Sequence, residues 1–414
     1  QNRMYMTKLS SIADYVTDKI SSNDIALREY VTTDCILQNK KGREIATNLP
    51  PQSCCLTRYQ HGDVLIANIR PYLKKVWFAD IDGGASSDVL VFRAKEGHSP
   101  SFLYAVLLQD SFFDYVMQGA KGSKMPRGDK EQILRYEMPT LSCSEESIGT
   151  FFLNLDQKIR LNEQINQNLE AMAKQLYDYW FVQFDFPDEN GRPYKSSGGE
   201  MVWNEKLKRK IPASWENKNI EDIADVYNGA TPSTINEQNY GGDIVWITPK
   251  DLSDQKQKFV YQGERNISQA GYNSCSTHLL PPNTILMSSR APIGLLSIAK
   301  TELCTNQGFK SFVPKAENIS TYLYYYLNIH IKQIEQLGTG TTFKEVSRED
   351  VLKFPILKPS DAILDLWEKQ VSALNNKQFV IQKENEFLTK QRDELLPLLM
   401  NGQVSVNSDL SNGL

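Results

Sequence analysis

The sequence predicts an α+β protein in which a globular domain followed by a long helix occurs twice, with the two long helices packed together. Two observations support this. A proline-free stretch at 147–181 repeats seam residues at heptad spacing, and a second such stretch runs from 363 to 400. The segments that precede these stretches also carry similar motifs in the same order. The chain is therefore predicted to be a tandem duplication.

The first long helix is predicted from alternating steps of four and three residues, the a/d pattern of a coiled coil. These seam positions are Leu155, Ile159, Asn162, Asn166, Leu169, Ala173, Leu176 and Trp180. At about 1.5 Å per residue such a helix would be roughly 45 to 50 Å long, which exceeds the width of a small domain. We therefore expect it to pack against another long helix.

The second stretch supplies that helix. Its seam positions are Leu374, Gln378, Ile381, Asn385, Leu388, Arg392 and Leu395. A single offset of 219 residues relates Leu155 to Leu374, Leu169 to Leu388 and Leu176 to Leu395. Asn166 and Asn385 are also equivalent, at seam positions where a polar residue specifies register at a cost in stability. This agreement argues against two unrelated amphipathic helices.

The composition sets limits on the class of protein. A chain of 414 residues that is 40% hydrophobic is long enough for two or three domains with buried cores. The net charge of −4 requires no nucleic-acid partner, so basic residues that bind one would have to be gathered locally. The six cysteines form no CxxC pair, which indicates a reducing compartment. The sequence has no basic-then-apolar leader and no apolar run of membrane-spanning length, so we expect a soluble, cytoplasmic protein.

The first globular domain is predicted to mix short strands with helices. SSIADYV suggests a short helix, and 62–94 reads as strands separated by Gly and Asp turns. Residues 100–118 are predicted to form one helix that starts at Pro100. A basic, Gly-rich loop, GAKGSKMPRGDK, and the segment ILRYEMPTL lead into the first long helix.

The connector that follows is rich in Gly, Pro and Ser. It contains a basic run for which we favour a solvated loop: Lys206, Lys208, Arg209 and Lys210. The second domain then repeats the order of the first, with Arg290 opposite Arg70 and GTGTTFKEVS opposite GAKGSKMPRG. The predicted boundaries are 1–144 and 215–360 for the domains, 145–184 and 361–403 for the long helices, 185–214 for the connector and 404–414 for a C-terminal tail.

Catalytic motifs are missing from this sequence. The four histidines have no metal-ligand spacing, and the Gly-Gly pairs match neither a dinucleotide-binding loop nor a P-loop. No Asn-Pro-Pro-Tyr element of an amino-methyltransferase occurs, and a nuclease-like string can be assembled only across the connector. We therefore predict no metal, no cofactor in this chain and no catalytic residues.

Side chains suited to DNA contact are present in several loops. TNQGFK supplies Asn306, Gln307 and Lys310, whose amides and ammonium group can pair with base edges or phosphates. SSRAPIG supplies Ser289 and Arg290, and the loop GTGTTFKEVS supplies Thr341, Thr342 and Lys344. The first domain offers a basic loop and a second basic group beside aromatic residues. Its predicted contact residues are Arg70, Lys74, Lys75, Lys121, Lys124, Arg127 and Lys130.

Structural roles compete with several of these assignments. Trp77, Phe92, Phe309 and Phe312 are predicted to be core residues rather than platforms for stacked bases. Asn306 and Gln307 could equally satisfy turn backbone groups. The two equivalent arginines could brace their own domains through buried pairs. For the loop with Lys121, the presence of an equivalent Gly-rich loop in the second copy favours a role in DNA contact over a purely structural one.

TPS, WITPKDL, SSRAPIG, TNQGFK and GTTFKEVS together resemble the hallmark stretches of the specificity (S) subunit of type I restriction–modification systems. KMPRGDK and the helix LDQKIRLNEQINQNLEAMAKQLYDYWF resemble the same family. The resemblance spans nearly the whole chain, and the first half is more divergent. It adds Thr231 of TPS and Lys250 of WITPKDL to the predicted DNA contacts.

The resemblance implies two target recognition domains, each reading one half of a bipartite DNA sequence. It implies that the two long helices pack as an antiparallel coiled coil, set the gap between half-sites and dock two methyltransferase (M) subunits, with restriction (R) subunits joining through them. S-adenosylmethionine would bind the methyltransferase partner. A fused repeat of this kind would be pseudo-twofold symmetric. The alternatives are a self-sufficient methyltransferase or nuclease and a coiled-coil adaptor that binds protein only.

Overall fold

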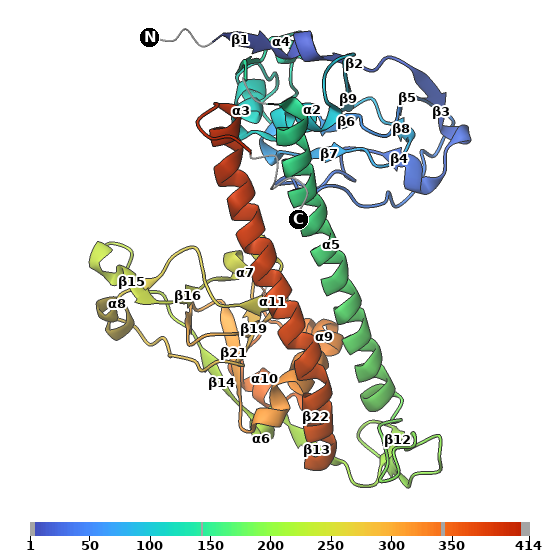
Figure 1. Cartoon of the computed structure of the whole chain (residues 1–414). Helices are drawn as coiled ribbons and strands as arrows, with labels where there is room; N and C mark the ends of the chain where they lie inside the picture. Colours follow the sequence, from blue (N-terminus) through green and yellow to red (C-terminus); the bar gives the residue numbers. More distant parts are fainter. Residues whose placement is uncertain (1–4, 142–143, 341–343, 407–414) are drawn as a thin grey trace. The chain divides into compact units, whose positions relative to one another are not determined.

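The computed structural model describes residues 5–141, 144–340 and 344–406. The chain forms two compact units, traced in Figure 1: Gln1–Ile165 with Lys383–Leu414, and Asn166–Gln382. Each unit therefore contains one globular domain and a segment of each of the two long helices, because both helices continue from one unit into the other. Within the described residues, no helix is long and apolar enough to cross a membrane.

The first unit is built on an antiparallel sheet in the order β2-β9-β6-β7. These strands are β2 (Ala13–Tyr15), β9 (Val89–Ala94), β6 (Val64–Ala67) and β7 (Val76–Phe78). All residues of β6 are buried, because this strand lies inside the sheet and packs against helix α2 (Pro100–Leu108). Ser99 caps α2 by accepting a hydrogen bond from the Phe102 amide, and Pro100 occupies its first turn.

A second sheet in this unit has the order β3-β5-β8-β4. Its strands are β3 (Lys19–Ser21), β5 (Cys55–Tyr59), β8 (Gly83–Ala85) and β4 (Tyr30–Val31). A Cβ at Gly83 would lie 2.1 Å from the Glu29 carbonyl oxygen, so close strand packing requires glycine there. The ends of the domain meet where β1 (Met6–Lys8) pairs with β10 (Glu137–Pro139).

The second unit is built on a sheet in the order β14-β21-β18-β19-β17. These strands are β14 (Ala224–Asn228), β21 (Phe309–Pro314), β18 (Ile285–Ser289), β19 (Ile293–Ala299) and β17 (Phe259–Val260). Helix α9 (Ser320–Gln336) packs on β19 and β18, and β13 (Glu216–Asn219) pairs with β22 (Pro355–Lys358).

The strand orders β2-β9-β6-β7 and β14-β21-β18-β19 are the same arrangement, which confirms the predicted tandem repeat of α+β domains. Short helices α1 (Leu9–Ile12) and α6 (Ile220–Ile223) precede the first strand of each sheet. Helices α4 (Lys130–Leu134) and α10 (Arg348–Leu352) likewise precede β10 and β22.

One predicted helix is interrupted. Residues 100–118 form α2 and then α3 (Asp110–Gln118), whereas the equivalent α9 is continuous. The break lies at Gln109, whose backbone is extended at φ −66° and ψ 141°. The Gln109 side chain donates to the Val106 carbonyl, and Asp110 at the start of α3 forms ion pairs with Lys40 and Lys74.

The predicted connector contains ordered structure. Strands β11 (Met201–Asn204) and β12 (Arg209–Pro212) form a hairpin, and the rings of Phe186 and Trp215 stack with centroids 5.2 Å apart. The basic residues of this hairpin are exposed. Arg209 lies over the Phe184 ring at 4.5 Å.

The two long helices are α5 (Glu145–Tyr177) and α11 (Asp361–Met400). In the first unit Asn162 donates to Asn385 at 2.8 Å, and Arg392 donates to Asp156 at 3.1 Å. In the second unit Asn166 donates to the Gln378 carbonyl at 3.2 Å, and the Tyr177 and Trp367 rings meet at 5.7 Å. Within each unit, later residues of α5 meet earlier residues of α11, so the helices are antiparallel, as predicted.

The seam positions differ in exposure. Buried are Leu155, Ile159, Asn162, Leu169, Ile381 and Leu388. Partly exposed are Asn166, Leu176, Leu374, Asn385 and Leu395. Trp77, Phe92, Phe309 and Phe312 are buried in the two domains, which confirms their prediction as core residues.

Candidate nucleic-acid interface

In the second unit, antiparallel pairing brings several predicted contact loops to one end of the sheet. Strands β14 and β18 end beside the start of β21, because Asn228 pairs with Lys310 and Ser288 pairs with Phe309. The loops that follow β14 and β18 and the loop that precedes β21 therefore lie together. These are the loops that carry Thr231, Arg290, Asn306 and Gln307.

Gly229 allows the first of these loops to approach the third. The Ala230 amide donates to the Thr305 carbonyl at 3.0 Å, and a Cβ at Gly229 would lie 2.1 Å from the Asn306 carbonyl oxygen. The Thr231 hydroxyl then donates to the Gln307 side-chain oxygen. The structure thus joins the TPS and TNQGFK motifs through their backbones and through one side-chain hydrogen bond.

Asn306 and Gln307 differ in what they leave available. The Asn306 side-chain oxygen accepts from the Gly308 amide at 2.8 Å, which is the turn role that competed with base contact in the prediction. Gln307 is exposed, and the hydrogen bond from Thr231 engages only its oxygen. Its amide nitrogen has two donors that can address base acceptors.

Ser289 and Lys310 are buried, which corrects their prediction as direct DNA contacts. Lys310 is 4% exposed, and its Nζ lies 3.3 Å from the Ser289 hydroxyl and 3.3 Å from the Glu345 carboxylate. The Ser289 carbonyl accepts from the Val346 amide. This cluster braces the Gly-rich loop against the strand instead.

That Gly-rich loop closes beside Arg290. Thr339 and Glu345 exchange two backbone hydrogen bonds of 3.0 Å, and Glu345 forms a bridge with Arg290. Lys344 is exposed at the loop, whereas Thr341 and Thr342 lie outside the described residues. Arg290 is half-buried. The geometry places Arg290 beside a glycine-rich loop that carries Lys344, a combination suited to phosphate.

Lys250 lies in helix α7 (Pro249–Gln255), which Thr248 caps through the Asp251 amide. Its ammonium lies 2.8 Å from the Glu264 carboxylate, and the hydrogen bond to that carboxylate raises the pKa of Lys250. Both side chains are exposed, so DNA phosphate could replace this partner at little cost.

The first unit repeats this arrangement at Arg70. The Arg70 amide donates to the Pro126 carbonyl at 2.8 Å, while Lys121 and Arg127 exchange two backbone hydrogen bonds of 2.9 Å. The Gly-rich loop of the first domain therefore closes beside Arg70 as its counterpart does beside Arg290. Asn68 secures the loop by exchanging side-chain hydrogen bonds with the Gly128 backbone.

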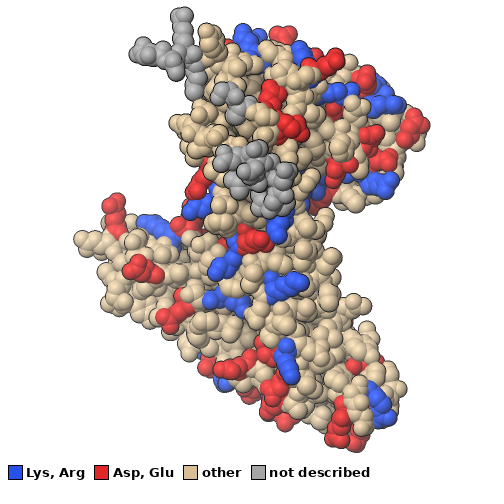
Figure 2. All heavy atoms as spheres, in the orientation of Figure 1, with Lys and Arg blue, Asp and Glu red and all other residues tan. Residues whose placement is uncertain are grey.

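The exposed basic residues of this loop are Lys121, Lys124 and Arg127, and Lys130 is exposed at the start of α4. Two of them have acidic neighbours: Arg127 lies 3.3 Å from Asp88, and Lys121 lies 3.5 Å from Asp129. Figure 2 shows acidic and basic side chains interspersed on the face it draws. Attraction for DNA must therefore act locally, at the loops.

Lys74 and Lys75 are half-buried and are used within the domain. Lys74 lies 2.8 Å from Asp110, and Lys75 donates to the Thr33 carbonyl at 2.7 Å. Burial opposes ionisation of Asp110, but hydrogen bonds from Lys74 and Lys40 outweigh it and lower the pKa of that carboxyl. These contacts favour a bracing role for both lysines over a DNA contact.

Sequence reasoning missed the residues that hold the loops in place. Asn68 has no motif of its own, and its only signal is that it stands two positions before Arg70, as Ser288 stands two positions before Arg290. Glu345 stands in the loop GTGTTFKEVS, but nothing in the sequence predicted that it would pair with Lys310, because the two residues are distant in sequence. Within the described residues there is also no cluster of His, Cys, Asp and Glu that could hold a metal ion.

Comparisons with known proteins agree with this geometry. Residues 212–385 match the family model of the type I restriction modification DNA specificity domain. The chain is 38% identical over 192 residues to the type I restriction enzyme MjaIX specificity subunit of Methanocaldococcus jannaschii, a match that covers 45% of this chain and 44% of that subunit. It is 27% identical to the HindI specificity subunit of Haemophilus influenzae over 96% of this chain and 98% of that subunit.

The fold is also found in a solved structure. The type I restriction–modification S subunit from M. genitalium superposes with a TM-score of 0.62 and 14% identity, over 98% of each chain. At that identity the likeness concerns the fold.

Proposed function

Because the chain belongs to the specificity-subunit family of type I restriction–modification systems, we propose that it reads a bipartite DNA target, with one half-site for each globular domain. The names of these relatives, which are specificity subunits, support the prediction of a recognition subunit. The finer parts of the proposal concern the two half-sites, the gap between them and the partner subunits.

The observation that carries this proposal is the duplicated loop constellation. An arginine beside a Gly-rich loop occurs at the same place in both domains, at Arg70 and at Arg290. The side chains around the two arginines differ, since the second domain offers Gln307 where the first offers a basic loop. Two equivalent frames with different side chains suit two half-sites of different sequence.

The proposal divides the contacts by chemistry. The exposed cations of the Gly-rich loops suit phosphates, which position a protein on DNA without reading sequence. They include Lys121, Lys124, Arg127, Lys130 and Lys344. Gln307 and the Asn306 amide nitrogen suit base edges.

The antiparallel helices would act as the ruler between half-sites. Reading domains that approach one face of B-DNA should contact sites about one helical turn apart, roughly 34 Å. At about 1.5 Å per residue, helices of this length can hold such a separation. Inserting or deleting one heptad in α5 and α11 should therefore change the gap, and an unaltered gap would contradict the ruler.

Exposed apolar residues on α11 support a scaffold role. Leu366, Val380 and Phe387 stand at multiples of seven residues and are 44%, 66% and 59% exposed. Heptad spacing places them on one face of the helix, as a helix-packing surface requires. We assign this face to the two methyltransferase subunits, with restriction subunits joining the complex and S-adenosylmethionine bound by the methyltransferase.

Methylome sequencing tests the proposal. A methylation-free host would carry this chain with its cognate methyltransferase subunit. We expect a split motif, with two short half-sites around a fixed gap and a methylated adenine in each. Exchanging residues 1–144 for those of a relative should change one half-site only.

Three outcomes would count against the proposal. A continuous motif would mean that the domains do not read separate half-sites. An assembled complex without methylation would favour a protein-only adaptor. Methylation of DNA by the purified chain with S-adenosylmethionine would instead make it a self-sufficient enzyme.

A further inference from the structure

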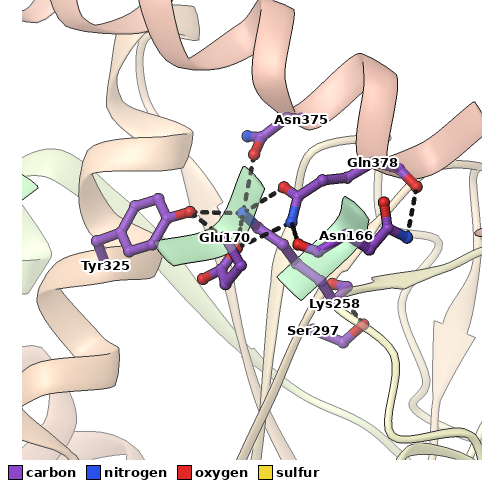
Figure 3. Close-up of polar contacts among 7 residues, drawn as sticks. All are labelled: Asn166, Glu170, Lys258, Ser297, Tyr325, Asn375 and Gln378. Carbon is purple, nitrogen blue, oxygen red and sulfur yellow. Dashed lines mark hydrogen bonds and ion pairs between the residues drawn. The ribbon is translucent and has the colours of Figure 1, made fainter. Parts of the chain in front are cut away.

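A buried lysine of the second globular domain reaches both long helices. Lys258 directly precedes β17, and its side chain is 10% exposed. Its Nζ donates to Glu170 at 2.6 Å, to the Tyr325 hydroxyl at 2.6 Å, and to two side-chain amide oxygens of α11. Those amides belong to Asn375, at 2.8 Å, and Gln378, at 3.1 Å. Figure 3 shows these acceptors converging on the ammonium group.

One charged atom thus connects four elements of the unit. Lys258 directly precedes strand β17 of the sheet, Tyr325 belongs to α9, Glu170 to α5 and the two amides to α11. Ile298 of the neighbouring strand β19 donates its amide to the Lys258 carbonyl at 2.8 Å, which holds the lysine backbone to the sheet. A shift of the domain along or around the helices would break several of these bonds at once.

The acceptors are themselves interlocked. Gln378 donates to Glu170 at 3.2 Å and to the Asn166 carbonyl at 3.2 Å, and Tyr325 lies 3.1 Å from Glu170. Burial alone would raise the pKa of Glu170, but the Lys258 ammonium and its hydrogen bonds outweigh burial and hold that pKa below its usual range. Burial lowers the pKa of Lys258, and the Glu170 carboxylate opposes that shift. The pair thus lies among further polar groups of the two helices, from Asn166, Asn375 and Gln378.

A second contact between this domain and the helices is apolar. The rings of Tyr177, Phe181 and Trp367 pack against Tyr322 and Tyr325. This aromatic cluster attaches the domain mainly by burying apolar surface. Asn375 and Gln378 lie two to three helical turns beyond Trp367 along α11, which makes Lys258 a separate point of attachment.

We propose that Lys258 is a positioning residue that sets the angle of the second globular domain on the helix pair, and thereby the gap length that the protein accepts between half-sites. This inference rests on the proposed bipartite recognition. A polar contact suits the role because buried polar groups in helix seams specify one arrangement among several that apolar packing allows. Neighbouring base pairs are only about 3.4 Å apart, so a small pivot of the domain would be enough to admit a gap that is one base pair longer or shorter.

The first unit holds a comparable contact at the equivalent helix position. Asp156 stands 219 residues before Asn375, the same offset that relates the two seams. It accepts from Tyr104 of α2 and from Arg392 of α11. Each globular domain is thus attached to the helix pair by a buried polar contact, with different residues in the two copies.

The test compares three variants in the assembled complex with the cognate methyltransferase, using methylome sequencing and melting temperatures. Lys258→Met removes the charge and keeps the length of the side chain. The double variant Lys258→Met with Glu170→Gln also removes the carboxylate charge that the first change leaves buried. The matched control is Lys353→Met, because Lys353 lies 3.9 Å from Glu349 in an exposed ion pair of the same unit.

We expect Lys258→Met to raise the ratio of methylation at altered-gap sites to methylation at native-gap sites by about tenfold or more. The altered gaps are one base pair longer or shorter than the native gap. The half-site sequences should stay the same, and the control should keep the native gap. The double variant should melt closer to the wild-type temperature and still accept the altered gaps. This variant also carries the test if Lys258→Met alone does not fold.

Two results would overturn the inference. In the first, both variants methylate only sites with the native gap. In the second, the double variant regains the native gap together with the wild-type melting temperature, which would mean that Lys258 contributes to stability only. Absence of a split motif in the wild-type complex would instead overturn the proposed function.

Discussion

Arg392 of α11 is a residue whose replacement should strongly destabilise the first unit. Its side chain is 4% exposed, and its guanidinium donates to the Asp156 carboxylate, which is 3% exposed, at 3.1 Å. The same carboxylate accepts from the buried Tyr104 hydroxyl. Replacing Arg392 with Met would leave the buried carboxylate with only the more distant Arg160, at 4.0 Å, as a counter-charge. Loss of one partner of a buried pair costs about 3–5 kcal/mol.

For a unit of about 200 residues, each kcal/mol lowers the melting temperature by roughly 2–4 °C. Arg392→Met should therefore lower the melting temperature of the first unit by roughly 6–20 °C, measured by scanning calorimetry. Adding Asp156→Asn removes the buried negative charge and retains a side-chain oxygen that accepts from Tyr104. Most of the lost melting temperature should therefore be recovered.

The control is Lys390→Met on the same helix, since Lys390 pairs with Glu394 at 3.8 Å and both side chains are exposed. That change should cost less than about 1 kcal/mol. The reasoning would be refuted if Arg392→Met cost no more than the control, or if the double variant were as unstable as the single one.

Three further predictions concern the second unit. Lys344→Gln should lower the slope of log affinity against log salt by about one without changing the sequence read, because it removes one of the proposed phosphate contacts. Anisotropy titrations over a range of salt would show this, and an equal effect of Lys353→Gln would count against it. Gly229→Ala should abolish reading of the second half-site while the complex still assembles, because the new Cβ would lie 2.1 Å from the Asn306 carbonyl oxygen. An unchanged methylome would disprove that recognition needs this close approach of the two loops. Burial lowers the pKa of His330, so the unfolded chain binds the proton first and the free energy of unfolding should fall as the pH drops below about 6.5. Urea titrations at several pH values should show a smaller pH dependence of the free energy of unfolding for His330→Phe than for wild type. An equal pH dependence in both would refute a role of His330 in it.

The bracing of the predicted contacts has a consequence for recognition. Lys74, Lys75, Ser289 and Lys310 are used inside their domains, so a smaller set of exposed side chains faces solvent. The loops that carry these side chains are held by backbone hydrogen bonds on both sides. Such preorganised loops lose little conformational freedom on binding, which favours discrimination between bases.

The sequence by itself determined the tandem repeat, the two long helices and the core aromatics. These properties are encoded by periodicity and by offset, which depend only on residues near one another in the chain or on copies of them. The order of similar motifs in the two halves predicted that Arg70 and Arg290 would be equivalent, and the same strand order in both domains places both arginines beside Gly-rich loops.

Only the tertiary structure decided which polar residues are partners. Lys258 meets residues 67 to 120 positions away, and Arg392 meets Asp156 across 236 positions. No local sequence pattern predicts such pairs, because the partners of a buried charged residue come from segments that are distant in sequence. For the same reason Ser289 and Lys310 stand in a motif suited to DNA contact and yet brace the loop, since burial depends on the neighbouring strands and the Gly-rich loop.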